Sequence, residues 1–238
     1  MTYAEMLLDL KARIGSSPEV DDTYLKGWLN RALHAFCSEG EFHWLEKKAT
    51  ANTIASQERY ALPSDFKIMS ELQVDGSAGS PEPYQLTTHE RRVLNSPGAK
   101  NFSIFADEIY LYPIPTASGS NNIEMWYLRK PTSMTDDADA PSDSDIANMP
   151  EEYHEALVIY AFANYNAYDE EHEEKRELMG DMRADAPGTY AYFVKKAIED
   201  DEKFKRGQRS RMMSRQEASG FAFPNQSGNT TTVLFRRR

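Results

Sequence analysis

The sequence has few of the residues that cross-linked, metal-stabilised or membrane-spanning proteins need. Its 238 residues include one cysteine, Cys37, which excludes an internal disulfide framework and a cysteine-based zinc site. No apolar run approaches the length of a membrane span. The first residues, MTYAEMLLDLKARIG, place acidic residues before basic ones around a short apolar run, so they match neither a signal peptide nor a membrane span. We therefore expect a protein of a reducing cytoplasm, or of a particle assembled there, with Cys37 as a buried and inert thiol.

Sequence motifs of the common enzyme classes are also absent. We find no HExxH, P-loop, GxGxxG or GxSxG pattern, and the five histidines are scattered along the chain. Glu151-x-x-His154 and Asp169-x-x-His172 fit the spacing of di-iron ligands, but that chemistry needs two facing helices and both pairs fall on one predicted helix. His43 beside Trp44 fits a ligand pocket or, more simply, packing at a corner. The sequence predicts no cofactor, no metal and no catalytic residue, and so a protein that is not an enzyme.

Charge is unevenly distributed along the chain. The net charge is -11, yet the last 36 residues hold nine Lys or Arg and one Glu, a net +8 that leaves -19 on the first 202 residues. An acidic body with a basic tail is typical of an interaction arm that binds a negative partner. That partner is either nucleic acid, bound through its phosphates, or an acidic protein surface on which the aromatic residues of the tail act as anchors.

Hydrophobic periodicity predicts an α+β fold. Apolar residues at helical spacing predict two N-terminal helices, the first over 2–14 with a capping-box pattern at Thr2 and Glu5 and with Gly15 at its end, and the strongest helical pattern of the chain begins at Pro150. Strand-like alternation and turn residues dominate between these two regions, with a hairpin that turns at Ala106 and Asp107 and a strand over 123–128 with both faces partly covered. We predict a helical bundle built from the N- and C-terminal helices, with an inserted small antiparallel β-sheet and an extended C-terminal arm. The predicted parts are a helical hairpin at 1–42, the sheet at 43–131, an acidic loop at 132–148, the C-terminal helices at 149–207, which form one domain with 1–42, and a basic arm at 208–238.

The loop 132–148 contains five aspartates without periodicity. Asp136, Asp137, Asp139, Asp143 and Asp145 suggest a calcium loop, but the glycine and the terminal glutamate of an EF-hand loop are missing. We expect a solvated linker.

Four short motifs resemble those of tailed-phage head-to-tail adaptor proteins, also called head-completion or neck connector proteins. The residues 60–66, YALPSDF, resemble the Y-x-LP-x-DF element of that family. The stretches EIYLYPIP at 108–115, MWYLRKPTSMTDD at 125–137 and MPEEYHEALVIYA at 149–161 resemble its other motifs and follow in its order. The likeness covers about 20 to 180 and leaves the tail after 207 unmatched.

The physical chemistry of the YALPSDF element is structural. Pro63 fixes its own backbone and makes the preceding residue extended, and Asp65 can accept N–H groups of the following turn. We expect Leu62, Phe66, Tyr110 and Trp126 to lie in the core and Tyr60 to be partly buried. The structural motif is thus Tyr60, Leu62, Pro63, Asp65 and Phe66.

The resemblance implies a ring of identical subunits, usually twelve, between the portal of the viral head and the tail or nozzle protein. Such a ring extends the channel through which viral DNA passes without sequence-specific binding, and an acidic lumen would not hold phosphates. We expect a virion protein of the neck, assembled in the bacterial cytoplasm and not in a membrane. In related adaptors a C-terminal extension reaches along the portal, which assigns portal binding here to Phe221, Phe223, Leu234, Phe235, Arg236, Arg237 and Arg238.

Two other classes of function stay open from sequence. One is a nucleic-acid-binding protein that uses its basic C-terminal arm, and the other is a metal-dependent oxidase or hydrolase of the helical part.

Overall fold

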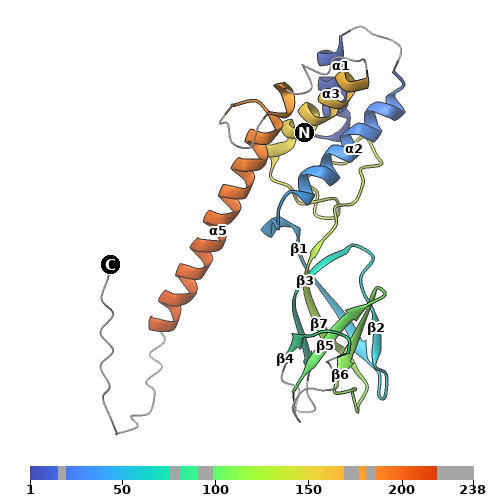
Figure 1. Ribbon diagram of the computed structural model, residues 1–238, viewed down its shortest axis with the longest axis vertical. Coiled ribbons are helices and arrows are strands. Elements are labelled where there is room, and N and C mark those ends of the chain that lie inside the picture. The colour runs from blue at the N-terminus through green and yellow to red at the C-terminus, as the bar shows by residue number, and fades with distance from the viewer. Residues whose placement is uncertain (16–19, 76–80, 91–98, 169–176, 181–185, 219–238) are drawn as a thin grey trace. The chain divides into compact units, whose positions relative to one another are not determined.

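The computed structural model describes residues 1–15, 20–75, 81–90, 99–168, 177–180 and 186–218 (Figure 1). The chain divides into two compact units, Met1–Glu199 and Asp200–Arg238, and each is described by itself. The first unit holds helices at both ends of a sheet that is inserted between them in sequence. The predicted α+β class is confirmed, while the division into the predicted domains stays a prediction.

Helix α1 (Tyr3–Ile14) begins and ends where the sequence predicts. The Thr2 hydroxyl accepts the N–H of Glu5, and the Glu5 carboxylate accepts the N–H of Thr2, which forms a capping box. Gly15 closes the helix with a φ of 81°, a conformation that favours glycine. Helix α2 (Asp22–Ser38) is capped by Asp21, whose side chain accepts the N–H of Thr23.

The helical core is formed by residues far apart in the sequence. The inward faces of α1 and α2 pack against α3 (His154–Tyr168), which follows the short helix η2 (Glu151–Tyr153), and against the first turns of α5 (Tyr190–Ala218). Phe36 illustrates this, because its ring lies about 6.0 Å from the rings of both Tyr153 and Tyr190. The largest fully buried side chains of this core are Tyr3, Met6, Leu10, Leu29, Leu33, Phe36, Phe42, Leu45 and Tyr153.

The sheet has seven strands in the order β1-β7-β3-β4-β5-β6-β2. Its strands are β1 (Glu46–Thr53), β2 (Arg59–Ala61), β3 (Phe66–Asp75), β4 (Pro81–Leu86), β5 (Asn101–Phe105), β6 (Glu108–Tyr112) and β7 (Gly119–Arg129). Every pairing is antiparallel except that of β4 with β5, which is parallel, so the predicted antiparallel sheet is confirmed with one exception. The predicted hairpin between β5 and β6 turns at Ala106 and Asp107, both at positive φ.

A second core lies on one face of this sheet. Along β7 the alternating residues Ile123, Met125 and Tyr127 are buried in it, while Leu128 is buried in the helical core. The end of β7 therefore contributes to both cores, which explains why its sequence pattern predicts two partly covered faces.

Cys37 lies near the end of α2, where the backbone carbonyls carry partial negative charge. The helix has no basic residue in its last turn, but Lys67 of β3 donates from Nζ to the Cys37 carbonyl oxygen at 3.0 Å. Burial raises the pKa of the Cys37 thiol to about 12, although the nearby positive charges of Lys67 and Arg129 act in the opposite direction. The thiol is buried and protonated at neutral pH, as expected for an inert cysteine.

Helix α5 is longer than predicted. It was expected to end near 207, and it continues to Ala218. Its first turns bury Tyr190, Ala191, Val194 and Ala197 within the first unit. Farther along, Lys203, Lys205 and Arg206 pair with acidic residues three or four positions earlier, at 2.8, 2.8 and 2.6 Å. Such pairs support an exposed helical segment.

Truncation of a core leucine should destabilise the first unit strongly. Leu29 is fully buried in the helical core, so Leu29→Ala removes apolar contacts and leaves a cavity. We expect a loss of about 2 to 5 kcal/mol in the free energy of unfolding, measured by chemical denaturation. Leu8→Ala is the matched control, because Leu8 on α1 is 67% exposed and its truncation should change stability by less than about 0.5 kcal/mol.

Candidate functional site

The YALPSDF element connects β2 to β3. Tyr60 is buried in the second core, and its hydroxyl accepts the N–H of Ile54 at 3.2 Å and donates to the Gln57 carbonyl at 3.1 Å. The tyrosine therefore closes the turn between β1 and β2. Tyr60 is therefore more buried than the partial burial that the sequence predicted.

The remaining residues expected in the core are less buried than predicted. Leu62 and Phe66 are half-buried against the second core, and the Phe66 ring lies 5.7 Å from that of Tyr127. Trp126 points to the face opposite Met125 and Tyr127, where Lys48 lies 4.8 Å above its ring. Tyr110 is half-buried on the face of β6 opposite Ile109 and Leu111. For Trp126 and Tyr110 the correction follows from strand alternation, since their neighbours along β7 and β6 occupy the core instead.

Asp65 links three segments of the chain. Its carboxylate pairs with Lys47 of β1 at 2.7 Å and accepts the Tyr127 hydroxyl of β7 at 2.8 Å. Its backbone carbonyl accepts the N–H of Lys130 at 2.6 Å, at the start of the segment that follows β7. The Asp65 carboxylate was expected to accept N–H groups of the following turn. In the structure the N–H of Phe66 donates to the Pro63 carbonyl instead.

The pKa of Asp65 reflects these contacts. Partial burial acts to raise it, but the hydrogen bonds from Lys47 and Tyr127 and the charge of Lys47 outweigh burial and hold the pKa below its ordinary value. Tyr127 responds in the opposite direction, because burial and the neighbouring carboxylate both raise its pKa. The charged form of Asp65 is therefore the one that the fold stabilises.

The acidic loop is an ordered part of the helical core, and its prediction as a solvated linker is wrong. We call residues 132–148 the acidic strap. Its apolar residues Met134, Ile146 and Ala147 are buried in the helical core, followed by buried Met149. The aspartates lie among these apolar positions, which is why composition alone suggested a solvated segment.

Backbone carbonyls of the acidic strap cap the first turn of α1. The N–H of Tyr3 donates to the Asp139 carbonyl at 2.7 Å, and that of Ala4 donates to the Asp137 carbonyl at 3.1 Å. These are two of the N–H groups that a helix start leaves without a partner. The Asp137 side chain also pairs with Lys26 of α2 at 2.7 Å, so the strap contacts both N-terminal helices.

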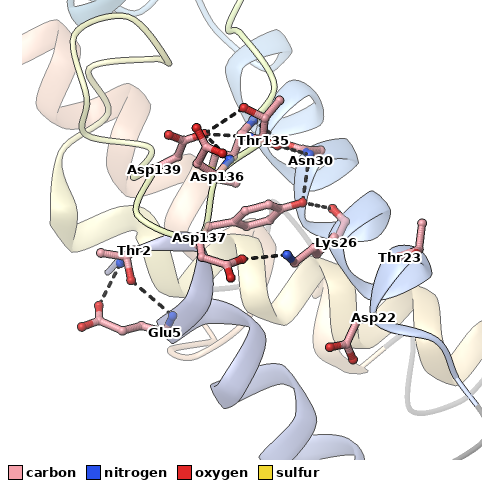
Figure 2. A network of polar contacts seen from close by, with 12 residues as sticks. Thr2, Glu5, Asp22, Thr23, Lys26, Asn30, Thr135, Asp136, Asp137 and Asp139 are labelled. Atoms are coloured by element: carbon pink, nitrogen blue, oxygen red, sulfur yellow. Dashed lines mark hydrogen bonds and ion pairs between the residues drawn. The ribbon is translucent and has the colours of Figure 1, made fainter.

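The side-chain amide of Asn30 on α2 bonds to the acidic strap through both its oxygen and its nitrogen. Its Oδ1 accepts the N–H of Met134 at 2.8 Å, and its Nδ2 donates to the Met134 carbonyl at 3.0 Å. The same Nδ2 lies 3.0 Å from the Tyr3 hydroxyl, which donates to the Lys26 carbonyl at 2.9 Å. This network, of which Figure 2 shows Asn30, Lys26 and the neighbouring strap aspartates, fixes the strap against α1 and α2.

Two of the strap aspartates serve its own backbone. Asp139 Oδ2 accepts the N–H groups of Thr135 and Asp136 at 2.7 and 2.9 Å, and these bonds hold the pKa of Asp139 below its ordinary value. Asp143 Oδ2 accepts the N–H of Ala140 at 2.7 Å. Within the described residues, no group of His, Cys, Asp and Glu has the arrangement to hold a metal ion. The carboxylates of Asp139 and Asp143 thus have a structural use that the calcium interpretation did not consider.

His154 is buried at the start of α3. Its Nδ1 lies 3.0 Å from the amino group of Met1, and its Nε2 lies 3.3 Å from the Met149 carbonyl. Burial lowers its pKa. The second candidate pair, Asp169 and His172, lies outside the described residues. Because both ring nitrogens of His154 face protein atoms, this histidine packs at the helix interface.

His43 lies at the corner between α2 and β1, in the short helix η1 (His43–Leu45). Its ring meets that of Trp44 edge-on at 5.3 Å, and Trp44 stacks on Phe42 at 4.3 Å. This is the packing alternative that the sequence left open.

The residues assigned to portal binding, Phe221, Phe223, Leu234, Phe235 and Arg236 to Arg238, lie outside the described residues. Their assignment stays a prediction. No helix of the described residues is long and apolar enough to cross a membrane.

Removal of the Asp65 carboxylate should destabilise the sheet in a pH-dependent way. Asp65→Ala leaves the buried Tyr127 hydroxyl without its acceptor, at a cost of about 1 to 3 kcal/mol at pH 7. Because the folded pKa of Asp65 is below its ordinary value of 3.8, the charged carboxylate stabilises the fold above that value. The contribution should decline as the pH falls through the folded pKa. Denaturation at several pH values tests this, with half-exposed Lys47→Ala expected to cost about 0 to 1 kcal/mol.

The Asn30 network should hold the acidic strap in place. Asn30→Ala leaves both backbone groups of Met134 unpaired, and we expect a loss of about 1 to 3 kcal/mol with faster hydrogen exchange at Met134. Asn164→Ala is the control, because Asn164 donates only to the Tyr160 carbonyl one turn earlier in its own helix. Unchanged exchange at Met134 in Asn30→Ala would contradict this role.

Comparison with known proteins identifies the family. A family model described as SU10 adaptor protein matches residues 1–218. No curated protein matches. Among solved structures, the neck of an empty GTA particle computed with C6 symmetry is similar, with 13% identity over 83% of this chain and 88% of that chain. Its TM-score of 0.31 is too low to carry an argument. The family match extends from the capping box of α1 to the last described residue of α5, so the chain belongs to the SU10 adaptor protein family.

Proposed function

We propose that this protein forms a ring of twelve identical copies between the portal and the tail of a phage particle. The ring extends the DNA channel below the portal and provides the surface on which the tail or nozzle protein docks. The observation that carries this proposal is the family match over residues 1–218, which includes the whole first unit and all of α5. Assembly takes place in the host cytoplasm, and the protein works in the neck of the virion.

The contacts of two motif regions agree with a structural function. In the YALPSDF element, Tyr60 closes a turn and Asp65 joins β1 to β7. The acidic strap binds the start of α1 through its backbone. Polar groups that are occupied with such internal bonds suit a protein that holds one shape inside a larger assembly.

Charge supports the role of a channel for DNA. The first 202 residues carry a net -19, so copies arranged around a lumen present an acidic wall to the phosphates. Like charges do not hold DNA, which must slide through the neck during packaging and ejection. A ring structure with a net-positive channel wall would contradict this part of the proposal.

The basic C-terminal arm is the part that we assign to the portal. Residues 219–238 contain Phe221, Phe223, Leu234, Phe235 and three terminal arginines. Aromatic anchors surrounded by arginines are typical of protein interfaces, where arginine pairs with carboxylates. The alternative function, binding of nucleic acid by the same arm, is favoured by its net positive charge alone.

Deletion of residues 219–238 separates these two functions. We expect the truncated chain to bind immobilised portal at least about 100-fold more weakly, because it lacks the contacts that we assign to the portal. A 100-fold loss corresponds to about 2.8 kcal/mol of binding free energy. The expected DNA binding is weak in both chains at physiological salt. Substitution of Phe221 and Phe223 by Ser should weaken portal binding. Substitution of Arg236 to Arg238 should weaken it less when binding is measured at high salt, because salt screens the attraction between the arginines and carboxylates. Two results together would favour the alternative. The truncated chain would keep portal binding and lose DNA binding, and the DNA binding of the full chain would fall steeply with salt.

A further inference from the structure

The second half of α5 has a surface that the described part of the chain leaves open. We call residues 203–218 the distal helix. Within 203–208 every residue is exposed except half-buried Lys205, and the aromatic side chain of Phe204 is 43% exposed. Because these residues are exposed in the single chain, a surface that covers them must come from another molecule.

A glycine lies inside the distal helix without a local reason. Gly207 is in the interior of α5, where glycine costs helix stability relative to alanine. A Cβ added at Gly207 would meet no atom within 4 Å, so the described residues leave room for a side chain there. Glycine at an exposed helical position lets the surface of another molecule approach the backbone closely.

The distal helix carries positive charge that its own sequence does not compensate. It holds six Lys or Arg and one acid, Glu217. The first three of these basic residues pair with acidic residues of α5. The other three, Arg209, Arg211 and Arg215, have no acidic residue three or four positions away in the sequence. Arg211 and Arg215 are four positions apart, a spacing at which like charges destabilise an isolated helix.

We propose that the distal helix of one copy docks on the acidic first unit of a second copy. The first unit, 1–199, has a net charge of -16, because the -19 of the first 202 residues includes the three acids at 200–202. Each copy supplies one helix and one acidic unit, so the contact is heterologous, and its repetition closes into a ring when the rotation allows. The proposal rests on the proposed function, since it names one contact of that ring.

Charge complementarity favours a second copy as the partner. Exposed carboxylates of the first unit, among them Asp136, Asp145 and Glu152, make no hydrogen bond or ion pair with other described residues. Two acidic units repel each other, and a basic helix placed between them reduces that repulsion. Nucleic acid fits less well, because the acids at 200–202 lie directly before the distal helix and repel phosphates.

Photo-cross-linking of the full-length chain mixed with portal tests the contact. Exposed Gln208 is replaced by an amino acid that carries a benzophenone, and isotope-labelled and unlabelled chains are mixed before assembly. We expect cross-links from position 208 of one copy to residues 1–199 of another, recognised by one labelled and one unlabelled peptide. A benzophenone at Leu8, a 67% exposed position of α1, is the control and should not select the same peptides.

Charge reversal tests the electrostatic part. Arg211→Glu combined with Arg215→Glu should raise the concentration for half-assembly at least about tenfold at low salt and less at high salt. Arg31→Glu combined with Lys130→Glu is the matched control, because it changes the net charge equally at two exposed positions of the first unit. We expect the control to shift half-assembly less than about twofold. Gly207→Leu should increase helix content in circular dichroism and yet weaken assembly, because its side chain blocks close approach.

The outcomes separate this contact from the ring itself. Cross-links from position 208 to the first unit of a different copy, together with the assembly defect of the Arg211 and Arg215 variant, support the contact. Wild-type rings that cross-link only within one copy, or only to portal or DNA, overturn the contact and leave the proposed function intact. A charge-reversed variant that assembles as its control does has the same meaning. A wild-type chain that stays monomeric in the presence of portal overturns both.

Discussion

The fold depends on the bonds between the acidic strap and the start of α1. The helical core is built from segments separated in sequence by the whole sheet, so α1 and α2 must be held against α3 by something other than chain connectivity. Packing in the helical core holds them together, and the strap adds backbone carbonyls that accept the first N–H groups of α1 and a two-sided bond to Asn30. Because Met134 is buried, loss of the Asn30 bonds would leave unsatisfied backbone groups in the core.

Strand β7 connects this arrangement to the sheet. It pairs with both β1 and β3, its end is buried in both cores, and it leads directly into the strap. Asp65 reinforces the same junction, since it contacts β1, β7 and Lys130 together. The first and third family motifs, which are 59 residues apart at their nearest ends, therefore meet at one place. That meeting explains why a stretch without reactive groups carries so distinctive a pattern.

The sequence allowed prediction of features set by local chemistry. The capping box of α1, the hairpin at Ala106 and Asp107, the buried Cys37 and the alternation of β7 all depend on residues close together in the chain. Tertiary contacts decided the features that were missed. The strap has a polar composition, and only its long-range partner Asn30 and its buried Met134 distinguish it from a linker. Helix α5 continues past its predicted end near 207 to Ala218, and Trp126 lies on the face of β7 opposite the one that packs in the second core.

Native mass spectrometry of the purified protein mixed with its portal tests the central claim, that this chain is a structural adaptor that assembles as a ring. The account predicts a complex whose mass corresponds to one portal and twelve copies of the 27.1 kDa chain, without bound metal. A monomer that does not associate with portal, and that instead binds DNA or carries a stoichiometric metal, would contradict it.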